Sequence, residues 1–350
     1  MFLLRIRRPR FSSRLAVVGR LTRSGLFTIL ATTAMTAIAA EKPTFHWSDQ
    51  PAAGVLDLKY GSAPVLRYMY AFDNSTPEKF HETYKVYHHV FGPGSDRLIT
   101  KGPGGQYTHH RGLYFAYNQT KAADGVFDFW HCRDGVSQRH VEFTELKADK
   151  DSASMTSRID WADKDGKPVI IESRTVTVRP IQLSDNAPAS AWQIDWSSTI
   201  TSQRGDITLT GDRQHAGFQF RADNAVAEAN SARYIRPAKA PQQAEAFQVP
   251  KGEQPPRHVD LDWLAMTYEL DGKRYTIEYF EAPSLPSPSR YSERPYGRFG
   301  AFIQHELKGD TPWTLRYRVI VSTGESPSQE QIQKRYDQFA KDLQAIQPAS

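Results

Sequence analysis

The sequence predicts an all-β protein, a large antiparallel β-sandwich that carries one helix at its C-terminal end. Several segments alternate polar and apolar side chains with period two, and turns rich in Asp and Gly separate them. This alternation is typical of antiparallel sheets, in which each strand has one wet face and one dry face. Helical periodicity is almost confined to residues 326–347. Together these observations favour a sandwich over a parallel α/β sheet.

Six segments carry the clearest strand pattern. Segment 167–178 (KPVIIESRTVTV) follows an Asp-Gly turn and alternates β-branched with polar residues. Segments 263–270 and 275–280 are joined by Asp271-Gly272-Lys273-Arg274, which is a hairpin signature. The expected strands are residues 167–178, 191–201, 206–210, 263–270, 275–280 and 313–321.

The end of the chain is expected to form a helix that packs on the sandwich. Ser326 is placed as the N-cap, with Pro327 at the first helical position and Gln329 at the third, which is a capping-box arrangement. The apolar side chains that follow share one face of this helix: Ile332, Tyr336, Phe339, Leu343 and Ile346. We therefore divide the mature chain into a β-sandwich domain, residues 41–325, and a C-terminal helix, residues 326–347.

Residues 1–40 have the composition of an export signal peptide. They contain seven arginines and neither lysine nor an acidic residue, and an apolar stretch over 25–39 ends in Ala37-Ile38-Ala39. Small residues in that spacing are typical of a cleavage site. We therefore expect a periplasmic or secreted protein that begins near Glu41. A mitochondrial transit peptide is the alternative, because such peptides are also rich in arginine and poor in acids.

Composition excludes several classes of protein. A hydrophobic content of 39%, a charged content of 24% and a mean hydropathy of −0.58 are typical of a soluble globular chain, not of a disordered or polytopic membrane protein. Without residues 1–40 the chain has 37 basic and 39 acidic residues, which argues against nucleic-acid binding. No later segment is apolar enough for a membrane span. A single cysteine, Cys132, excludes an internal disulfide and a cysteine-cluster zinc site.

Histidines are numerous and unevenly placed. The glycine-rich stretch 92–105 leads into segment 107–112 (YTHHRG), where His109 and His110 are adjacent. Adjacent side chains of an extended strand point to opposite faces, so both histidines serve one site only if the backbone is irregular there. Three further segments near the ends of expected strands add polar side chains: 128–131, 139–141 and 212–215. The sequence has no G-x-S-x-G, P-loop, G-x-G-x-x-G or H-E-x-x-H motif, so the cofactor is left open.

The order of these motifs resembles the PmoA-like bacterial family, whose members are often described as a domain of unknown function. The resemblance extends over about 66–324 and rests on segments 109–115 (HHRGLYF), 128–130 (DFW), His140, 172–174 (ESR), 212–221, 283–286 and 294–299. It implies a large sandwich of the galactose-mutarotase type, or supersandwich, and a role in carbohydrate metabolism. His215 stands where the family commonly has an acid. The methane-oxygenase activity in the family's name is not carried over, because no membrane span is expected in the mature chain.

The leading hypothesis is an exported carbohydrate-active enzyme, such as an epimerase, lyase or hydrolase, that uses histidine acid–base chemistry on a sugar or sugar derivative. A histidine with a pKa near about 6.5 exchanges protons at neutral pH. His109 and His110 are the expected acid–base pair. The other expected catalytic or orienting residues are His140, Asp212 and His215, and the expected substrate-binding residues are Arg111, Trp130, Arg221, Arg294 and Tyr296. The partner is then a small sugar-like ligand, and no metal ligand is assigned.

Two alternatives stay open. The first is a metal-dependent hydrolase or lyase, since neutral imidazole is a ligand for Zn, Cu, Fe and Ni; its ligands would be His109, His110, His140 and His215. The second is a protein that binds carbohydrate without catalysis, through aromatic rings and arginines. All three hypotheses depend on whether the histidines lie close together in the folded protein.

Overall fold

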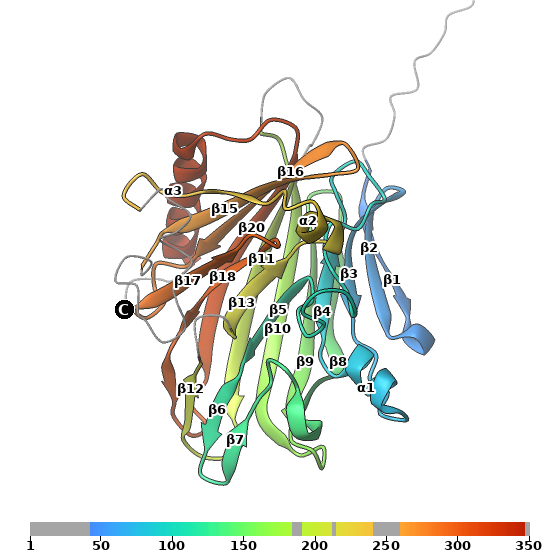
Figure 1. Cartoon of the computed structure of the whole chain (residues 1–350), viewed down its shortest axis with the longest axis vertical. Coiled ribbons are helices and arrows are strands. Elements are labelled where there is room, and N and C mark those ends of the chain that lie inside the picture. Colours follow the sequence, from blue (N-terminus) through green and yellow to red (C-terminus); the bar gives the residue numbers. More distant parts are fainter. Residues whose placement is uncertain (1–42, 184–190, 212–214, 241–259, 347–350) are drawn as a thin grey trace, which may run out of the picture. The chain divides into compact units, whose positions relative to one another are not determined.

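The computed structural model describes residues 43–183, 191–211, 215–240 and 260–346. The expected signal peptide, residues 1–40, and the expected site residue Asp212 therefore lie outside the described residues. The described chain forms three antiparallel sheets, two of eight strands and one of four (Figure 1). This confirms the predicted all-β class. No described helix is long and apolar enough to cross a membrane.

The first sheet contains the N-terminal strands and three later ones. In spatial order its strands are β1 (Phe45–Gln50), β2 (Val55–Tyr60), β3 (Ala63–Met69), β4 (Tyr87–Val90), β5 (Leu113–Tyr117), β13 (Ala216–Arg221), β18 (Arg298–Ile303) and β17 (Ser289–Arg294). The chain thus returns twice from distant segments, which places β13 beside β5 and β18 beside β13.

The second sheet contains most of the long strands. Its order is β14 (Arg233–Ile235), β15 (Trp263–Leu270), β16 (Lys273–Glu281), β20 (Trp313–Thr323), β11 (Ala191–Ser202), β10 (Pro168–Ile181), β9 (Ala153–Ala162) and β8 (Ser137–Ala148). The small sheet is β19 (His305–Leu307), β12 (Ile207–Thr210), β6 (Gln119–Ala122) and β7 (Gly125–Phe127). The helical segments are η1 (Pro51–Ala53), α1 (Pro77–Thr83), η2 (Arg133–Gly135), α2 (Asn224–Glu228) and α3 (Gln329–Ile346).

The main core lies between the two large sheets. The Phe115 ring of β5 contacts Trp161 of β9, and the Phe218 ring of β13 contacts Trp196 of β11. Because side chains alternate along a strand, the neighbours of these residues point to the opposite face of the first sheet. Tyr114 is one of them. That outer face of β5, β13 and β18 carries the polar groups described below.

A second core lies between the second sheet and the C-terminal helix, which Figure 1 shows beside β15 and β16. Ile332, Tyr336 and Phe339 of α3 are buried there. The Arg335 guanidinium makes two hydrogen bonds, of 2.7 and 2.8 Å, to the buried Glu278 carboxylate of β16. The C-terminal helix therefore packs on the second sheet.

The start of this helix and its last turn differ from the prediction. The cap is Ser328, not Ser326: its hydroxyl accepts the Gln331 N–H at 3.2 Å, and the Gln331 side chain accepts the Ser328 N–H at 2.8 Å. This is the same capping-box chemistry two residues later. Ile346, expected on the buried face, is 68% exposed because the helix ends there.

The expected hairpin at 263–280 is present with a shorter turn. Leu270 pairs directly with Lys273, so only Asp271 and Gly272 form the loop. Their φ angles of 53° and 73° are left-handed, which Asp tolerates and glycine adopts freely.

Candidate functional site

Three histidines from separate segments meet beside β5 and β13. His109 lies in the loop between β4 and β5, His131 follows β7, and His215 directly precedes β13. One ring nitrogen from each lies within 4.8 Å of the other two. Ring centroids are 4.5 Å apart for His109 and His131, 4.8 Å for His131 and His215, and 6.0 Å for His109 and His215. All three are partly buried. We call them the three-histidine cluster.

The loop that carries His109 passes tightly against its neighbours. Gly112 accepts a backbone hydrogen bond from Arg221 of β13 at 2.9 Å. A Cβ atom at Gly112 would lie 2.2 Å from the carbonyl oxygen of His88 on β4, so glycine is required there. The glycine after the His-His-Arg motif thus lets the loop return to β5 with both histidines held above the sheet.

Two buried cations hold the shape of this loop. The Lys101 ammonium donates to three backbone carbonyl oxygens of residues 102–110, at 3.1 to 3.3 Å. The Arg111 guanidinium donates to two carbonyl oxygens within the loop and to the His81 carbonyl oxygen at 2.8 Å. Arg111 was expected to bind substrate, whereas these bonds make it a residue that positions His109 and His110.

A carboxylate orients the second histidine of the cluster. Asp128 Oδ2 accepts a hydrogen bond from His131 Nδ1 at 2.8 Å, and Asp128 Oδ1 accepts the backbone N–H groups of Trp130 and His131 at 3.1 and 2.9 Å. Burial opposes ionisation of Asp128, but its hydrogen bonds to His131 outweigh burial and lower the pKa of the carboxyl group. With Nδ1 donating its proton, His131 keeps its Nε2 lone pair for a ligand.

Two adjacent histidines of this region, His109 and His110, are neutral at neutral pH. Burial, reinforced by the Lys85 ammonium and by His131 and His215, lowers the pKa of His109 to about 2. Burial and the Arg298 guanidinium lower the pKa of His110 well below its usual range. The acid–base hypothesis assumed a pKa near about 6.5; the environment of these two rings removes that premise and favours the neutral form that binds metals.

Four residues expected at the site do lie together. The His110 ring is 4.3 Å from that of His109, 5.9 Å from Trp130 and 6.0 Å from Tyr296. Trp130 also contacts His215, with centroids 5.9 Å apart. The Arg221 guanidinium lies 5.1 Å from the Tyr296 ring centroid. His110, Trp130, Arg221 and Tyr296 therefore border the three-histidine cluster.

His140 does not join them, so the expected convergence is wrong for this residue. It lies on β8, at the edge of the second sheet, where its Nδ1 bonds the Ser157 hydroxyl at 2.6 Å and its ring packs on Tyr70 and Phe143. The Arg294 guanidinium donates to the neighbouring Glu293 carbonyl oxygen at 2.9 Å. His140 thus lies on a different sheet from β5 and β13, and Asp212 lies outside the described residues.

His131 is the ligand candidate that sequence reasoning did not single out. The signal was present in Asp128-Phe129-Trp130-His131, because a carboxylate three residues before a histidine can reach it across a turn. The turn itself is closed by the Cys132 N–H donating to the Asp128 carbonyl oxygen at 2.8 Å.

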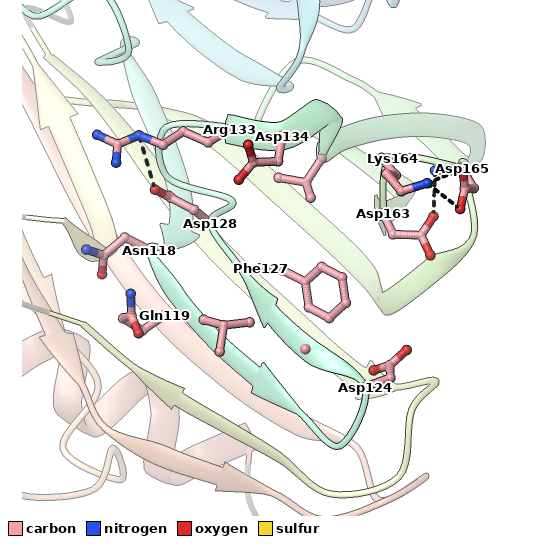
Figure 2. Close-up of a pocket in the computed structure, with 13 residues that line it drawn as sticks. Asn118, Gln119, Asp124, Phe127, Asp128, Arg133, Asp134, Asp163, Lys164 and Asp165 are labelled. Carbon is pink, nitrogen blue, oxygen red and sulfur yellow. Dashed lines mark hydrogen bonds and ion pairs between the residues drawn. The ribbon is translucent and has the colours of Figure 1, made fainter.

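A separate cavity of about 500 Å³ has Asp128 among its lining residues (Figure 2). It is lined by Asn118, Phe127 and several acids, and the Arg133 Nε is 3.8 Å from Asp128 Oδ2 at its wall. None of the three histidines lines it. Asp128 therefore links the wall of this cavity to the orientation of His131.

One family model matches the chain. The model described as Family of unknown function (DUF6807) matches residues 55–337. This finding overturns the expected PmoA-like assignment, for which no match supports the name. No curated protein matches the chain.

Solved structures similar to the chain include three carbohydrate-active enzymes. The first is a GH36 alpha-galactosidase, AgaA, from Geobacillus stearothermophilus, with 11% identity and a TM-score of 0.34, covering 81% of this chain and 40% of that one. The second is the heparan sulfate lyase HepC from Pedobacter heparinus, with 9% identity and a TM-score of 0.35, covering 79% of this chain and 36% of that one. The third is a Glycoside Hydrolase Family 97 enzyme from Pseudoalteromonas sp. strain K8, with 12% identity and a TM-score of 0.32, covering 81% of this chain and 34% of that one. The chain thus spans two fifths or less of the length of these enzymes.

Proposed function

We propose that this chain, which belongs to the family of unknown function DUF6807, is a metal-dependent hydrolase or lyase that acts on a sugar derivative. The observation that carries the proposal is the three-histidine cluster, with one ring nitrogen each from His109, His131 and His215 within 4.8 Å of one another. Three imidazoles, one of them held by a carboxylate, form a donor set typical of catalytic metal sites.

The donor set fits a first-row metal ion such as zinc. Two nitrogens bound at about 2.0–2.1 Å to one ion in tetrahedral geometry are about 3.4 Å apart. The three ring nitrogens, which lie within 4.8 Å of one another, would therefore approach one another by up to about 1.4 Å when they bind an ion. A zinc ion with three protein ligands keeps a fourth position for water and lowers the pKa of that water to about 7, which supplies a nucleophile or base at neutral pH.

The chain's own residues prepare the site for this chemistry. Asp128 fixes the His131 tautomer through the 2.8 Å hydrogen bond to Nδ1. The Lys85 ammonium donates to the carbonyl oxygens of Trp130 and His109, so it ties two ligand-bearing segments together. Burial keeps the His109 imidazole unprotonated, with its pKa at about 2, so that protons do not compete for its lone pair.

Aromatic rings beside the cluster support a sugar derivative as substrate. Tyr107 is 45% exposed, and its ring centroid is 4.6 Å from that of Tyr296, which stacks with His110. Aromatic faces next to polar groups hold sugars by their C–H surfaces. A periplasmic or secreted location stays a prediction from residues 1–40.

Metal binding by the purified chain tests the proposal. We expect one equivalent of bound transition metal in elemental analysis and in calorimetric titration of chelator-treated protein. His131→Ala and His215→Ala should lose that binding, because each removes one of three ligands, whereas His140→Ala should keep it. A wild-type chain that binds no transition metal at micromolar concentration, or a His131→Ala variant that binds as the wild type does, would overturn the proposal.

A further inference from the structure

Two buried arginines face each other across neighbouring strands without an acid between them. Arg221 of β13 and Arg298 of β18 are register partners, and both side chains are fully buried. Like charges directly opposite on a sheet are destabilising, and a buried charge without a counter-ion is costly. Among the described residues, neither arginine forms an ion pair. The pair of buried arginines therefore does not stabilise the fold.

The two guanidinium groups are held in place by neutral acceptors, with donors to spare. Arg298 donates to the side-chain oxygens of Gln219 and Ser292 at 2.9 and 3.0 Å. Arg221 donates through one nitrogen to the carbonyl oxygens of Ala222 and Tyr296. The donors left without a partner are Arg221 Nε, Arg221 Nη2 and Arg298 Nε. Each side chain is thus oriented, while part of its hydrogen-bonding capacity stays unused.

A third unpartnered group lies on the same face. The hydroxyl of Tyr114 is buried and has no hydrogen-bond partner, and Tyr114 is the register partner of Gln219, which holds Arg298. The outer face of β5, β13 and β18 therefore carries a tyrosine hydroxyl and two guanidinium groups, all with free donors. Buried donors in folded proteins nearly always have a partner, so this group points to a missing acceptor.

Further buried cations lie around this face. Besides the two arginines, Lys85, Lys101 and Arg111 are buried nearby, and among the described residues none of these three forms an ion pair. Their donors go to backbone carbonyl oxygens. A buried group of cations is stabilised by an anion, which guanidinium groups recognise by paired hydrogen bonds.

This face adjoins the three-histidine cluster through one ring. His110 lies 4.3 Å from His109 on one side and 6.0 Å from Tyr296 on the other, by ring centroids, and Tyr296 covers Arg221. A ligand whose charged group binds the arginines would therefore place its uncharged part near the cluster. Tyr296 is only partly buried and contacts both Arg221 and His110, so its displacement would open a route to the arginines.

We propose that Arg221, Arg298 and Tyr114 bind an oxyanion group of the substrate, so that the substrate is an acidic sugar derivative bearing a carboxylate, sulfate or phosphate. The inference rests on the proposed function in one respect: it takes the three-histidine cluster as the place where the substrate reacts. The anion site itself is carried by the unpaired arginines and the unpaired hydroxyl.

Two tyrosines on β5 provide a matched pair of variants. Tyr114→Phe removes a hydroxyl without a partner, whereas Tyr117→Phe removes one that donates to the Ile303 carbonyl oxygen at 2.8 Å. Chelator-treated protein is titrated by calorimetry with D-glucuronate, D-glucose 6-sulfate, D-glucose 6-phosphate and D-glucose. We expect at least one of the acids to bind about tenfold or more tighter than glucose. Tyr114→Phe should weaken that binding about tenfold, and Tyr117→Phe should leave it unchanged.

An arginine variant and a charge-matched control complete the test. Arg298→Gln should abolish the preference for acids, while Arg139→Gln, which removes a positive charge on β8, should not. Circular dichroism confirms that each variant is folded. The anion site is refuted if no acid binds below about 10 mM, if glucose binds as tightly as the acids, or if Tyr114→Phe and Tyr117→Phe have equal effects. Acid binding by a wild-type chain that binds no transition metal would support the anion site and refute only the proposed function.

Discussion

Replacing Asp128 by asparagine should weaken metal binding about 10- to 100-fold while leaving the fold intact. The Asp128 carboxylate has two separate tasks: Oδ2 accepts from His131 Nδ1 at 2.8 Å, and Oδ1 accepts two backbone N–H groups at 2.9 and 3.1 Å. An asparagine side chain keeps the second task, because its carbonyl oxygen accepts both N–H groups. Its amide nitrogen then faces His131 Nδ1 as a donor.

The magnitude follows from this change of tautomer. A donor facing Nδ1 favours the tautomer with the proton on Nε2, which then has no lone pair for a metal ion. Loss of such an orienting partner typically costs 10- to 100-fold in metal affinity, about 1.4 to 2.7 kcal/mol. Asp128→Ala would in addition remove the acceptor of the two backbone N–H groups, a loss that costs about 0.5–2 kcal/mol of stability at comparable caps.

The assay measures metal affinity and stability for the same three proteins. Zinc affinity of the wild type, Asp128→Asn and Asp128→Ala is determined by competition with a chromophoric chelator at pH 7.5, and chemical denaturation is measured without metal. We expect both variants to lose affinity and only the alanine variant to lose stability. If Asp128→Asn binds zinc as tightly as the wild type while His131→Ala does not bind it, Asp128 does not orient the ligand and the reasoning is wrong.

The remaining predictions concern stability. In urea unfolding, Tyr114→Phe should stabilise the ligand-free protein and Tyr117→Phe should destabilise it, each by about 1–3 kcal/mol. The first variant removes a hydroxyl that has no partner, and the second leaves a buried carbonyl oxygen without its donor. Equal effects of the two variants on stability would contradict this reasoning. Burial raises the pKa of Glu281 from 4.5 to about 7, so the folded chain holds a proton that the unfolded chain has lost. Stability should therefore fall by about 3 kcal/mol as pH rises from 4.5 to 7, and a Glu281→Gln variant whose pH profile is as steep as the wild type's would refute this. Arg335→Met should lower the free energy of unfolding by about 3–5 kcal/mol in the same assay, because it leaves the buried Glu278 carboxylate unpaired. Adding Glu278→Gln should recover much of that loss. If stability does not recover, the loss comes from the packing of the Arg335 side chain and not from its charge.

The strands of the second sheet could be predicted from the sequence, whereas most of the first sheet could not. Strands such as β10 and β11 alternate in burial, so their period of two is visible in the residues. All five residues of β5 are buried, because one face packs on the core and the other lies under the loop and turn that carry the histidines. A short continuous apolar run of that kind does not distinguish a strand from a buried helical segment.

The site could be predicted in part for a related reason. His109 and His215 were recognised from local motifs, but their meeting depends on the pairing of β5 with β13, which no local pattern encodes. His140 looked equivalent because it also stands near an expected strand. It fails because β8 lies at the edge of the other large sheet. His131 was missed because its partner, Asp128, acts through a turn whose shape the sequence does not display.

The way buried charges are distributed is an independent argument for where the ligand binds. Several buried charged side chains elsewhere in the described part of the chain are matched by oppositely charged ones: Glu172 with Arg174, Glu293 with Arg236, and Glu278 with Arg335. Each of these pairs satisfies the requirement that a buried ion has a counter-ion. Arg221 and Arg298 have no such counter-ion among the described residues, and they lie beside the histidines whose ring nitrogens converge. Since natural sequences keep such costly exceptions mainly at functional sites, the unpaired arginines and the three-histidine cluster are best understood as two halves of one binding site.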